Sequence, residues 1–268
     1  MKIIALLTDF GYKDNFVGVM KGVILSINPR INLVDISHGV KPQSILEAYF
    51  LLKNSYAFFP NGTIFVAVVD PGVGTKRKPI LIETNDYFFI GPDNGIFSFI
   101  EPHNINRIIH LTNDKYFLKP VSSTFHGRDI FAAVAGFLSR GVSLKEFGPT
   151  IKNMKRIEIP KPRLVREKLV GKIIYVDGFG NLISNISRDV FDKFIGDSTF
   201  EITIGKARIS KISHSYVEAE AKSPIALFNS FQNLEISIKA NSCAERLGLK
   251  EGEKVEVTLL KRDKREST

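Results

Sequence analysis

One carboxylate follows a buried strand in the first half of the chain and precedes a glycine-rich loop. Residues 66–77 read Val-Ala-Val-Val-Asp-Pro-Gly-Val-Gly-Thr-Lys-Arg, so the apolar run ends at Asp70 and Arg77 comes seven positions later. Enzymes with parallel sheets present reactive side chains where strands end, and glycines there let the backbone approach a ligand. The segment therefore predicts an active-site edge. A salt bridge between Asp70 and Arg77 that only fixes the loop is the alternative.

His126 is the second candidate for catalysis. It stands in the run Thr-Phe-His-Gly-Arg-Asp at residues 124–129, directly before an apolar helical stripe. A histidine at a helix start can transfer protons, or it can simply begin the helix. Asp70, Arg77 and His126 lack the spacing of metal ligands, so no metal is predicted. The sequence has no Gly-x-Ser-x-Gly elbow, which argues against a serine hydrolase.

Polar side chains also follow other predicted strands of the first half. Asp9, in Thr-Asp-Phe-Gly at residues 8–11, can accept two hydrogen bonds from a vicinal diol such as a ribose. It can equally cap the helix that begins near Asn15. Asn94 stands in Gly-Pro-Asp-Asn-Gly at residues 91–95, where ordinary turn and cap chemistry is the simpler explanation.

Two segments of the second half interrupt strands with groups that can bind a ligand. Residues 177–181 read Asp-Gly-Phe-Gly-Asn, in which Asp177 can accept from an ammonium group and Asn181 offers a donor and an acceptor. Residues 228–231 read Phe-Asn-Ser-Phe and end another strand. Ordinary turn chemistry is the alternative for both segments.

The predicted secondary structure that must position these groups differs between the first 150 residues and the rest of the chain. Residues 1–150 alternate between strand and helix periods, which predicts an α/β domain with a mostly parallel sheet flanked by helices. Strands are expected at 2–8, 31–36, 63–70, 79–84, 87–90 and 105–111, and helices at 16–27, 45–52 and 129–138.

Strands dominate the rest of the chain. Residues 151–168 contain Pro160 and Pro162 with an excess of charge, and are expected to be a linker. Residues 169–262 are expected to form a smaller β-barrel or sandwich domain, and 263–268 a charged tail. Its strands are predicted at 169–176, 200–204, 207–212, 225–228, 234–238 and 254–260.

The composition argues against several classes of protein. No apolar run approaches the length of a membrane span. The single cysteine, Cys243, excludes an intrachain disulfide and suits a reducing cytoplasm. The net charge of +9 is spread out, with mild clusters at 152–172 and 261–265 and no interleaved aromatics. Nucleic-acid binding is therefore the least favoured function, and membrane association is not expected.

Taken together, these segments resemble the S-adenosyl-methionine (SAM) hydroxide adenosyltransferase family, the relatives of SAM-dependent fluorinases and chlorinases. The resemblance implies an α/β N-terminal domain, a β-barrel C-terminal domain and a homotrimer with ligand sites between subunits. It implies SAM as substrate, no cofactor, and adenosine and methionine as products, and an archaeal, thermophilic member is expected. Abundant Lys and Ile and the absence of Trp suit a thermophile. It is carried by residues 8–11, 70–74 with Arg77, 91–95, 125–129, 177–181 and 229–230.

The resemblance also implies roles for individual residues. Hydroxide-transferring members carry an Asp, Arg and His trio that halogenating members lack, and it maps to Asp70, Arg77 and His126. The second half of the chain departs from the family pattern at two positions. Phe231 stands where the halogenases have an arginine, and Gln232 stands where the family usually has a glycine. The expected substrate-binding residues are Asp9 for the ribose, Asp177 and Ser230 for the methionine end, Phe179 and Asn181 near the adenine, and Asn94.

The implied reaction needs an activated water, because the leaving group is already a neutral thioether. Arg77 can stabilise hydroxide character, and Asp70 or His126 can receive the proton. A carboxylate beside an arginine is a poor base, so the sequence favours His126 as acceptor and Asp70 as the group that orients the water. A non-catalytic module that binds SAM or adenosine and a SAM-dependent halogenase are the alternatives.

Overall fold

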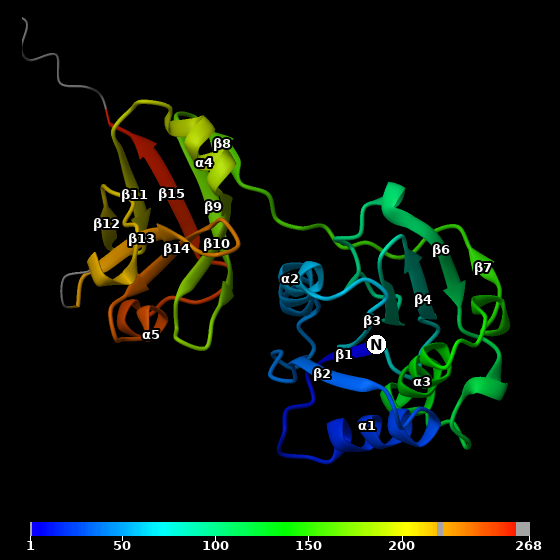
Figure 1. The fold of residues 1–268 in the computed structure, drawn as a ribbon. Helices are drawn as coiled ribbons and strands as arrows, with labels where there is room; N and C mark the ends of the chain where they lie inside the picture. Colours follow the sequence, from blue (N-terminus) through cyan, green and yellow to red (C-terminus); the bar gives the residue numbers. More distant parts are fainter. Residues whose placement is uncertain (1, 219–221, 261–268) are drawn as a thin grey trace, which may run out of the picture. The chain divides into compact units, whose positions relative to one another are not determined.

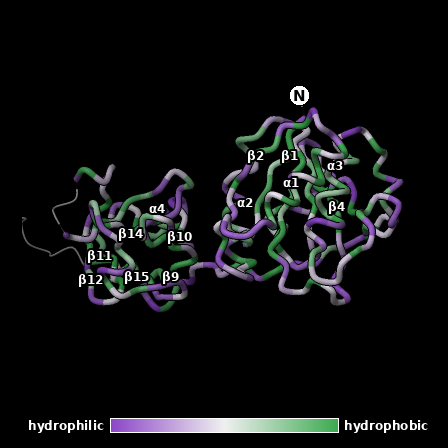
Figure 2. Tube along the Cα trace, turned by 90° about the horizontal axis from the view of Figure 1, so that it is seen from below, coloured by the Kyte–Doolittle hydropathy of each residue, from purple (hydrophilic) through white to green (hydrophobic). Residues whose placement is uncertain are grey.

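The computed structural model describes residues 2–218 and 222–260, and the chain divides into two compact units, residues 1–158 and 159–268 (Figure 1). Figure 2 shows hydrophobic segments gathered in the interior of each unit and hydrophilic ones around them. Within the described ranges no helix is long and apolar enough to cross a membrane. The predicted charged tail at 263–268 and the basic cluster at 261–265 lie outside the described residues.

The first unit is built on a seven-stranded sheet. Its strands are β1 (Ile3–Thr8), β2 (Asn32–Ser37), β3 (Ile64–Val68), β4 (Pro79–Thr84), β5 (Phe88–Pro92), β6 (Ile105–His110) and β7 (Thr150–Ile151), in the order β2-β1-β3-β5-β4-β6-β7. The first four in that order are parallel, whereas β4 and β6 pair only antiparallel. The α/β prediction is confirmed, but the sheet is mixed rather than mostly parallel. The reason is the tight turn at residues 84–87, which reverses the chain without a crossover helix.

Helices cover both faces of this sheet. They are α1 (Phe16–Ile27), α2 (Ile45–Ser55), the π-helix η4 (Gly127–Ala132) and α3 (Ala133–Ser139), with 3-10 turns η1 (Tyr56–Phe58), η2 (Pro102–Asn104), η3 (Asp114–Tyr116) and η5 (Leu144–Glu146). Successive side chains of a strand point to opposite faces. Ile4 and Leu6 of β1 therefore pack with α1, η4 and α3, whereas Ala5 and Leu7 pack with α2. Figure 1 shows α1 beside α3, with α2 apart from them.

The second unit is a nearly closed antiparallel barrel. Its strands are β8 (Arg163–Val165), β9 (Lys168–Val176), β10 (Leu182–Ser187), β11 (Phe200–Ile204), β12 (Ala207–Ile209), β13 (Pro224–Phe228), β14 (Asn233–Ile238) and β15 (Lys254–Leu259). They follow the order β12-β11-β15-β9-β10-β14-β13, with β8 paired to β9. A bridge between Ile212 and Ala226 nearly closes the ring. The remaining elements are α4 (Arg188–Ile195), α5 (Cys243–Leu247) and the 3-10 turn η6 (Tyr216–Glu218).

Several elements of the second unit were not predicted from the sequence. β10 reads Leu-Ile-Ser-Asn-Ile-Ser directly after a turn signal, so it lacks the regular alternation of apolar and polar residues that predicts a strand. α4 and α5 are short, and each begins at a serine whose hydroxyl accepts a backbone amide, Ser187 from Val190 and Ser242 from Glu245. Within the predicted linker, β8 forms an exposed strand.

Candidate active site

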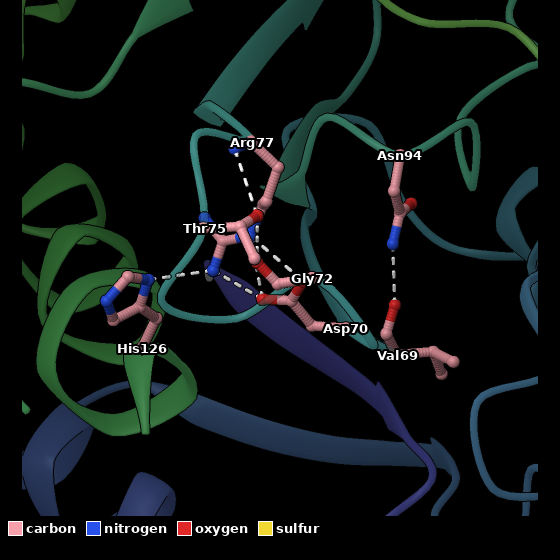
Figure 3. Close-up of polar contacts among 7 residues, drawn as sticks. All are labelled: Val69, Asp70, Gly72, Thr75, Arg77, Asn94 and His126. Atoms are coloured by element: carbon pink, nitrogen blue, oxygen red, sulfur yellow. Dashed lines mark hydrogen bonds and ion pairs between the residues drawn. The ribbon is translucent and has the colours of Figure 1, made fainter. Parts of the chain in front are cut away.

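Asp70 and Arg77 form a buried ion pair at the carboxyl end of β3. The strand is buried along its whole length, and Asp70 follows it by two residues. The loop then turns back through a hydrogen bond from the Val73 amide to the Asp70 carbonyl. Arg77 Nε lies 2.9 Å from both carboxylate oxygens, and Nη2 also bonds to Oδ2 (Figure 3). The two side chains are only 6% and 8% exposed, so this is a desolvated charge pair.

The same arginine reaches His126. Arg77 Nη2 lies 2.8 Å from His126 Nδ1, as Figure 3 shows. A guanidinium can only donate, so Nδ1 accepts and the ring proton of the neutral imidazole sits on Nε2. Burial, followed by the positive charge of Arg77, lowers the pKa of His126, so the ring is neutral near pH 7. Asp70, Arg77 and His126 thus form one continuous hydrogen-bonded chain.

A π-helix places the histidine against the arginine. His126 directly precedes η4, and Phe131 of the same helix lies under the guanidinium, with its ring centre 5.3 Å from Arg77 Cζ. The sequence predicted a regular helix from residue 129. Single π turns inside helices recur at functional sites, because the wider turn redirects side chains.

Two further residues hold the histidine segment in place. Asp129 is fully buried and accepts hydrogen bonds from the Ser122 amide at 2.7 Å and from Arg128 Nε at 2.5 Å. Gly74 has φ +74°, and a β-carbon there would lie 2.5 Å from the Ser123 carbonyl oxygen. The glycine of the Asp70 loop is therefore required for the close approach of the two segments. Sequence reasoning gave Asp129 no role, although it stands in the 124–129 segment.

A cavity of about 370 Å³ opens beside this chain of side chains. Asp9, Asp70 and His126 all line it, together with Pro42 and Gln43. Asp9 does not cap α1, whose N-cap residue is Asn15. Its Oδ2 instead accepts the Gln43 amide at 2.8 Å. The cavity thus brings two predicted catalytic groups and the predicted ribose-binding carboxylate to one edge of the sheet.

An aromatic wall completes this cavity. Phe10, Phe16 and Phe125 all line it, and their ring centres lie 5.2–5.7 Å apart in tilted and edge-on contacts. The sequence analysis assigned none of the three to the site. Their combination with two carboxylates gives a pocket with an apolar side and a charged side.

Asn94 lies elsewhere. It is 7% exposed, and its Nδ2 donates to the Val69 carbonyl at 2.7 Å (Figure 3). Its Oδ1 accepts the Ile96 amide. Both ends of the amide are therefore used inside the protein. This geometry supports the structural alternative, in which Asn94 ties the end of β3 to the 91–95 turn, and not substrate binding.

Three of the four predicted ligand groups of the second unit line a different cavity. It measures about 550 Å³ and is lined by Asp177, Phe179, Asn181, Tyr216 and residues 238–242. Asp177 Oδ1 accepts the Phe179 and Asn181 amides, and its Oδ2 accepts Asn181 Nδ2, each at 2.9 Å. This turn leaves Phe179 82% exposed, so its ring is accessible to a ligand in the cavity.

Ser230 stands apart from that cavity. It is exposed in the turn between β13 and β14, where Asn229 Oδ1 accepts the amides of Phe231 and Asn233. Gln232 has φ +60° in the same turn, a conformation that favours glycine. Gln232 therefore holds a backbone conformation that a glycine would adopt more easily.

Comparison with known proteins agrees with this geometry. The model of the SAM hydroxide adenosyltransferase N-terminal domain matches residues 4–148, and that of the C-terminal domain matches residues 171–256. The chain belongs to the SAM hydroxide adenosyltransferase family. Asp70, Arg77 and His126 lie in its N-terminal family domain, and the 177–181 turn lies in its C-terminal one.

Two relatives of this family member are named (R)-S-adenosyl-L-methionine hydrolase. The protein from Methanocaldococcus jannaschii is 36% identical over 96% of both chains. The Thermus thermophilus protein is 31% identical over 94% of this chain and 98% of its own. A fluorinase from Actinoplanes is 28% identical over 71% of this chain and 74% of its own. A crystal structure from Thermotoga maritima superposes with a TM-score of 0.87 at 34% identity, covering 95% of this chain and 99% of that one.

Proposed function

We propose that this protein hydrolyses SAM to adenosine and methionine by attack of water on the ribose C5′ carbon. The observation that carries the proposal is the buried chain from Asp70 through Arg77 to His126, which borders the cavity that Asp9 also lines. The hydrolase names of the relatives agree with it. In the reaction, the water oxygen forms a bond to C5′, the C5′–S bond breaks, and its electron pair neutralises the sulfonium.

Asp70 is the group we assign to accept the proton of the water. The Nδ1 lone pair of His126 faces a donor of Arg77, so the imidazole presents only its Nε2 proton to other partners. This geometry does not support the sequence-based choice of His126 as acceptor. The attacking oxygen becomes strongly acidic as its bond to carbon forms, so a carboxylate is a sufficient base. Arg77 fixes that carboxylate through two nitrogens and its charge stabilises hydroxide character.

The chemistry of the remaining side chains assigns each of them to a part of the substrate. Asp9 accepts hydrogen bonds from the ribose diol, and the wall of Phe10, Phe16 and Phe125 excludes competing water and faces the sulfonium. In the second unit, Asp177 binds the methionine ammonium while Phe179 and Asn181 contact the adenine. We infer a homotrimer in which a neighbouring copy supplies these second-unit groups. Cytoplasmic location stays a prediction from the single cysteine.

Incubation of the pure protein with SAM in ¹⁸O-labelled water tests the reaction. Label at the 5′-hydroxyl of the released adenosine is expected, since attack occurs at C5′. Release of unlabelled adenosine, or of adenine alone, would contradict it. Chloride at high concentration is expected to give no halogenated adenosine, because the Asp, Arg and His trio is present.

The assembly is tested separately by mixing two inactive variants. Asp70→Ala chains have intact second units, and Asp177→Ala chains have intact first units. If sites form between copies, mixed trimers regain part of the activity, whereas mixtures of independent monomers stay inactive. Light scattering measures the oligomeric state of each variant.

A further inference from the structure

A second chain of polar contacts lies behind the Asp9 loop, and the proposed chemistry does not use it. Thr8 and His38 are 0% and 1% exposed, and Thr8 Oγ1 lies 2.7 Å from His38 Nδ1. On the other side of the ring, His38 Nε2 lies 3.1 Å from Asp35 Oδ1. Lys21 Nζ at 2.7 Å and the Tyr12 hydroxyl at 3.1 Å hold the second oxygen of Asp35.

The direction of each hydrogen in this chain follows from the charges. Burial, followed by the nearby charge of Lys21, lowers the pKa of His38 despite the opposing effect of Asp35, so the ring is neutral near pH 7. The single ring proton faces the Asp35 carboxylate, and Nδ1 therefore accepts from the Thr8 hydroxyl. Thr8 Oγ1 in turn accepts the Phe10 amide at 3.3 Å. Polar contacts of 2.7–3.3 Å thus link Lys21 to the backbone beside Asp9, and the step between His38 and Asp35 is an ion-pair contact rather than an aligned hydrogen bond.

His38 holds the Asp9 loop at both of its ends. Its side chain bonds to Thr8, directly before Asp9, and its carbonyl accepts the Gly11 amide at 2.8 Å, two residues after it. The segment that follows His38 contributes Gln43, whose amide donates to the Asp9 carboxylate. Gln43 adopts φ +66°, so a left-handed backbone is maintained at that contact.

We propose that Thr8, His38 and Asp35 are positioning residues that fix the Asp9 carboxylate in the orientation that recognises a vicinal diol. None of the three lines the cavity, so they act through the backbone of the 8–11 loop. The inference rests on the proposed function, because the diol in question is that of the substrate ribose. It predicts that loss of the chain weakens recognition of the 2′-hydroxyl more than binding of the base.

The test compares Thr8→Val with Thr8→Ser in the full-length chain. Valine keeps the shape of threonine but removes the hydroxyl, whereas serine keeps the hydroxyl. Titration calorimetry measures Kd for adenosine and for 2′-deoxyadenosine. The wild type is expected to prefer adenosine by about tenfold or more, as for a hydrogen bond to a charged group. Thr8→Val is expected to reduce that ratio to about threefold or less, and Thr8→Ser to keep it.

Thr63→Val is the matched control. Thr63 is 1% exposed and its hydroxyl donates to the Pro60 carbonyl at 2.7 Å, so the same substitution removes one buried hydrogen bond. It directly precedes β3, at the end of the sheet opposite Thr8. The control should lose stability and retain the preference for adenosine.

Equal weakening of both nucleosides in Thr8→Val, or equal ratios in Thr8→Val and Thr8→Ser, would overturn the proposal. If Thr8→Val fails to fold, Asp35→Asn replaces it, since Asp35 is 26% exposed; an unchanged ratio there also overturns the proposal. A wild type that does not discriminate between the nucleosides overturns it as well. If the wild type prefers adenosine over 2′-deoxyadenosine but releases no adenosine from SAM, the proposed hydrolysis is refuted and the positioning role of Thr8, His38 and Asp35 is not.

Discussion

Replacing Asp70 by Asn removes the charge that Arg77 neutralises while keeping the shape of the side chain. The pair is more than nine-tenths buried on both sides, so no large discount for solvent applies. Removing one partner of a buried pair costs about 3–5 kcal/mol. Contacts of Arg77 with His126 and Phe131 remain, which favours the lower end, about 3 kcal/mol. For a unit of this size that corresponds to a fall in Tm of about 6–12 °C.

The kinetic effect of Asp70→Asn is expected in kcat. An amide cannot accept the proton of the attacking water, and loss of a well-placed base lowers a rate by about 10²–10⁴-fold. KM should change little, because our assignment places Asp70 against the nucleophile and not against the ribose or the adenine. Adenosine release is measured at a temperature well below the lowered Tm, so that unfolding does not contribute.

Glu201→Gln is the matched control for the stability measurement. Glu201 pairs with Arg208 at 2.7 Å, as closely as many buried pairs, but the two side chains are 29% and 68% exposed. Exposed pairs contribute about 0–1 kcal/mol, so this variant should melt near the wild type. A fall in Tm as small for Asp70→Asn as for Glu201→Gln, or a kcat within about threefold of the wild type, would refute the reasoning.

Other predictions concern pH, a turn and a buried amide. Burial is the main cause that lowers the pKa values of His38 and His126 in the folded chain, and the charges of Lys21 and Arg77 add to it. As the pH falls below the ordinary histidine pKa of 6.5, the unfolded chain therefore binds more protons than the folded chain. The free energy of unfolding in urea should therefore decrease from about pH 7.5 to about pH 5.5, and less steeply in His126→Gln. Gln232→Gly should raise stability by about 0.5–1 kcal/mol in thermal melts, since it relieves a left-handed backbone. Asn94→Ala should cost about 1–3 kcal/mol through an unpaired buried carbonyl, with KM nearly unchanged; a large rise in KM would restore Asn94 to the binding site.

The parts of the site that follow strand ends could be predicted from the sequence. Asp9 and Asp70 come after apolar runs that become the adjacent parallel strands β1 and β3, and such strands end at one edge. The contact between Arg77 and His126 could not be predicted in the same way. It joins residues 49 positions apart and depends on a π-helix and on the approach of Gly74 to Ser123, for which no local pattern exists.

Residue type alone does not reveal the contacts that a polar side chain makes. Asn94 has the composition of a ligand group, but its amide faces the Val69 carbonyl, and the sequence does not reveal the direction of a side chain in a turn. His38 is a lone histidine after a strand and was given no role in the sequence analysis, although the residue is only 1% exposed and contacts both ends of the Asp9 loop. Its importance depends on Thr8 and Asp35 from two different strands, which only the sheet brings together.

The π-helical turn at Gly127–Ala132 bears on how this site could be gained or lost in evolution. A π turn corresponds to one residue inserted into an α-helix. Deleting that residue would restore α-helical geometry and rotate His126 by about 100° around the helix axis relative to Phe131. The guanidinium of Arg77 would then lose its contact with one of the two rings. A change in chain length by one residue, with no substitution of Asp70, Arg77 or His126, would therefore be enough to break the contacts that join these three side chains.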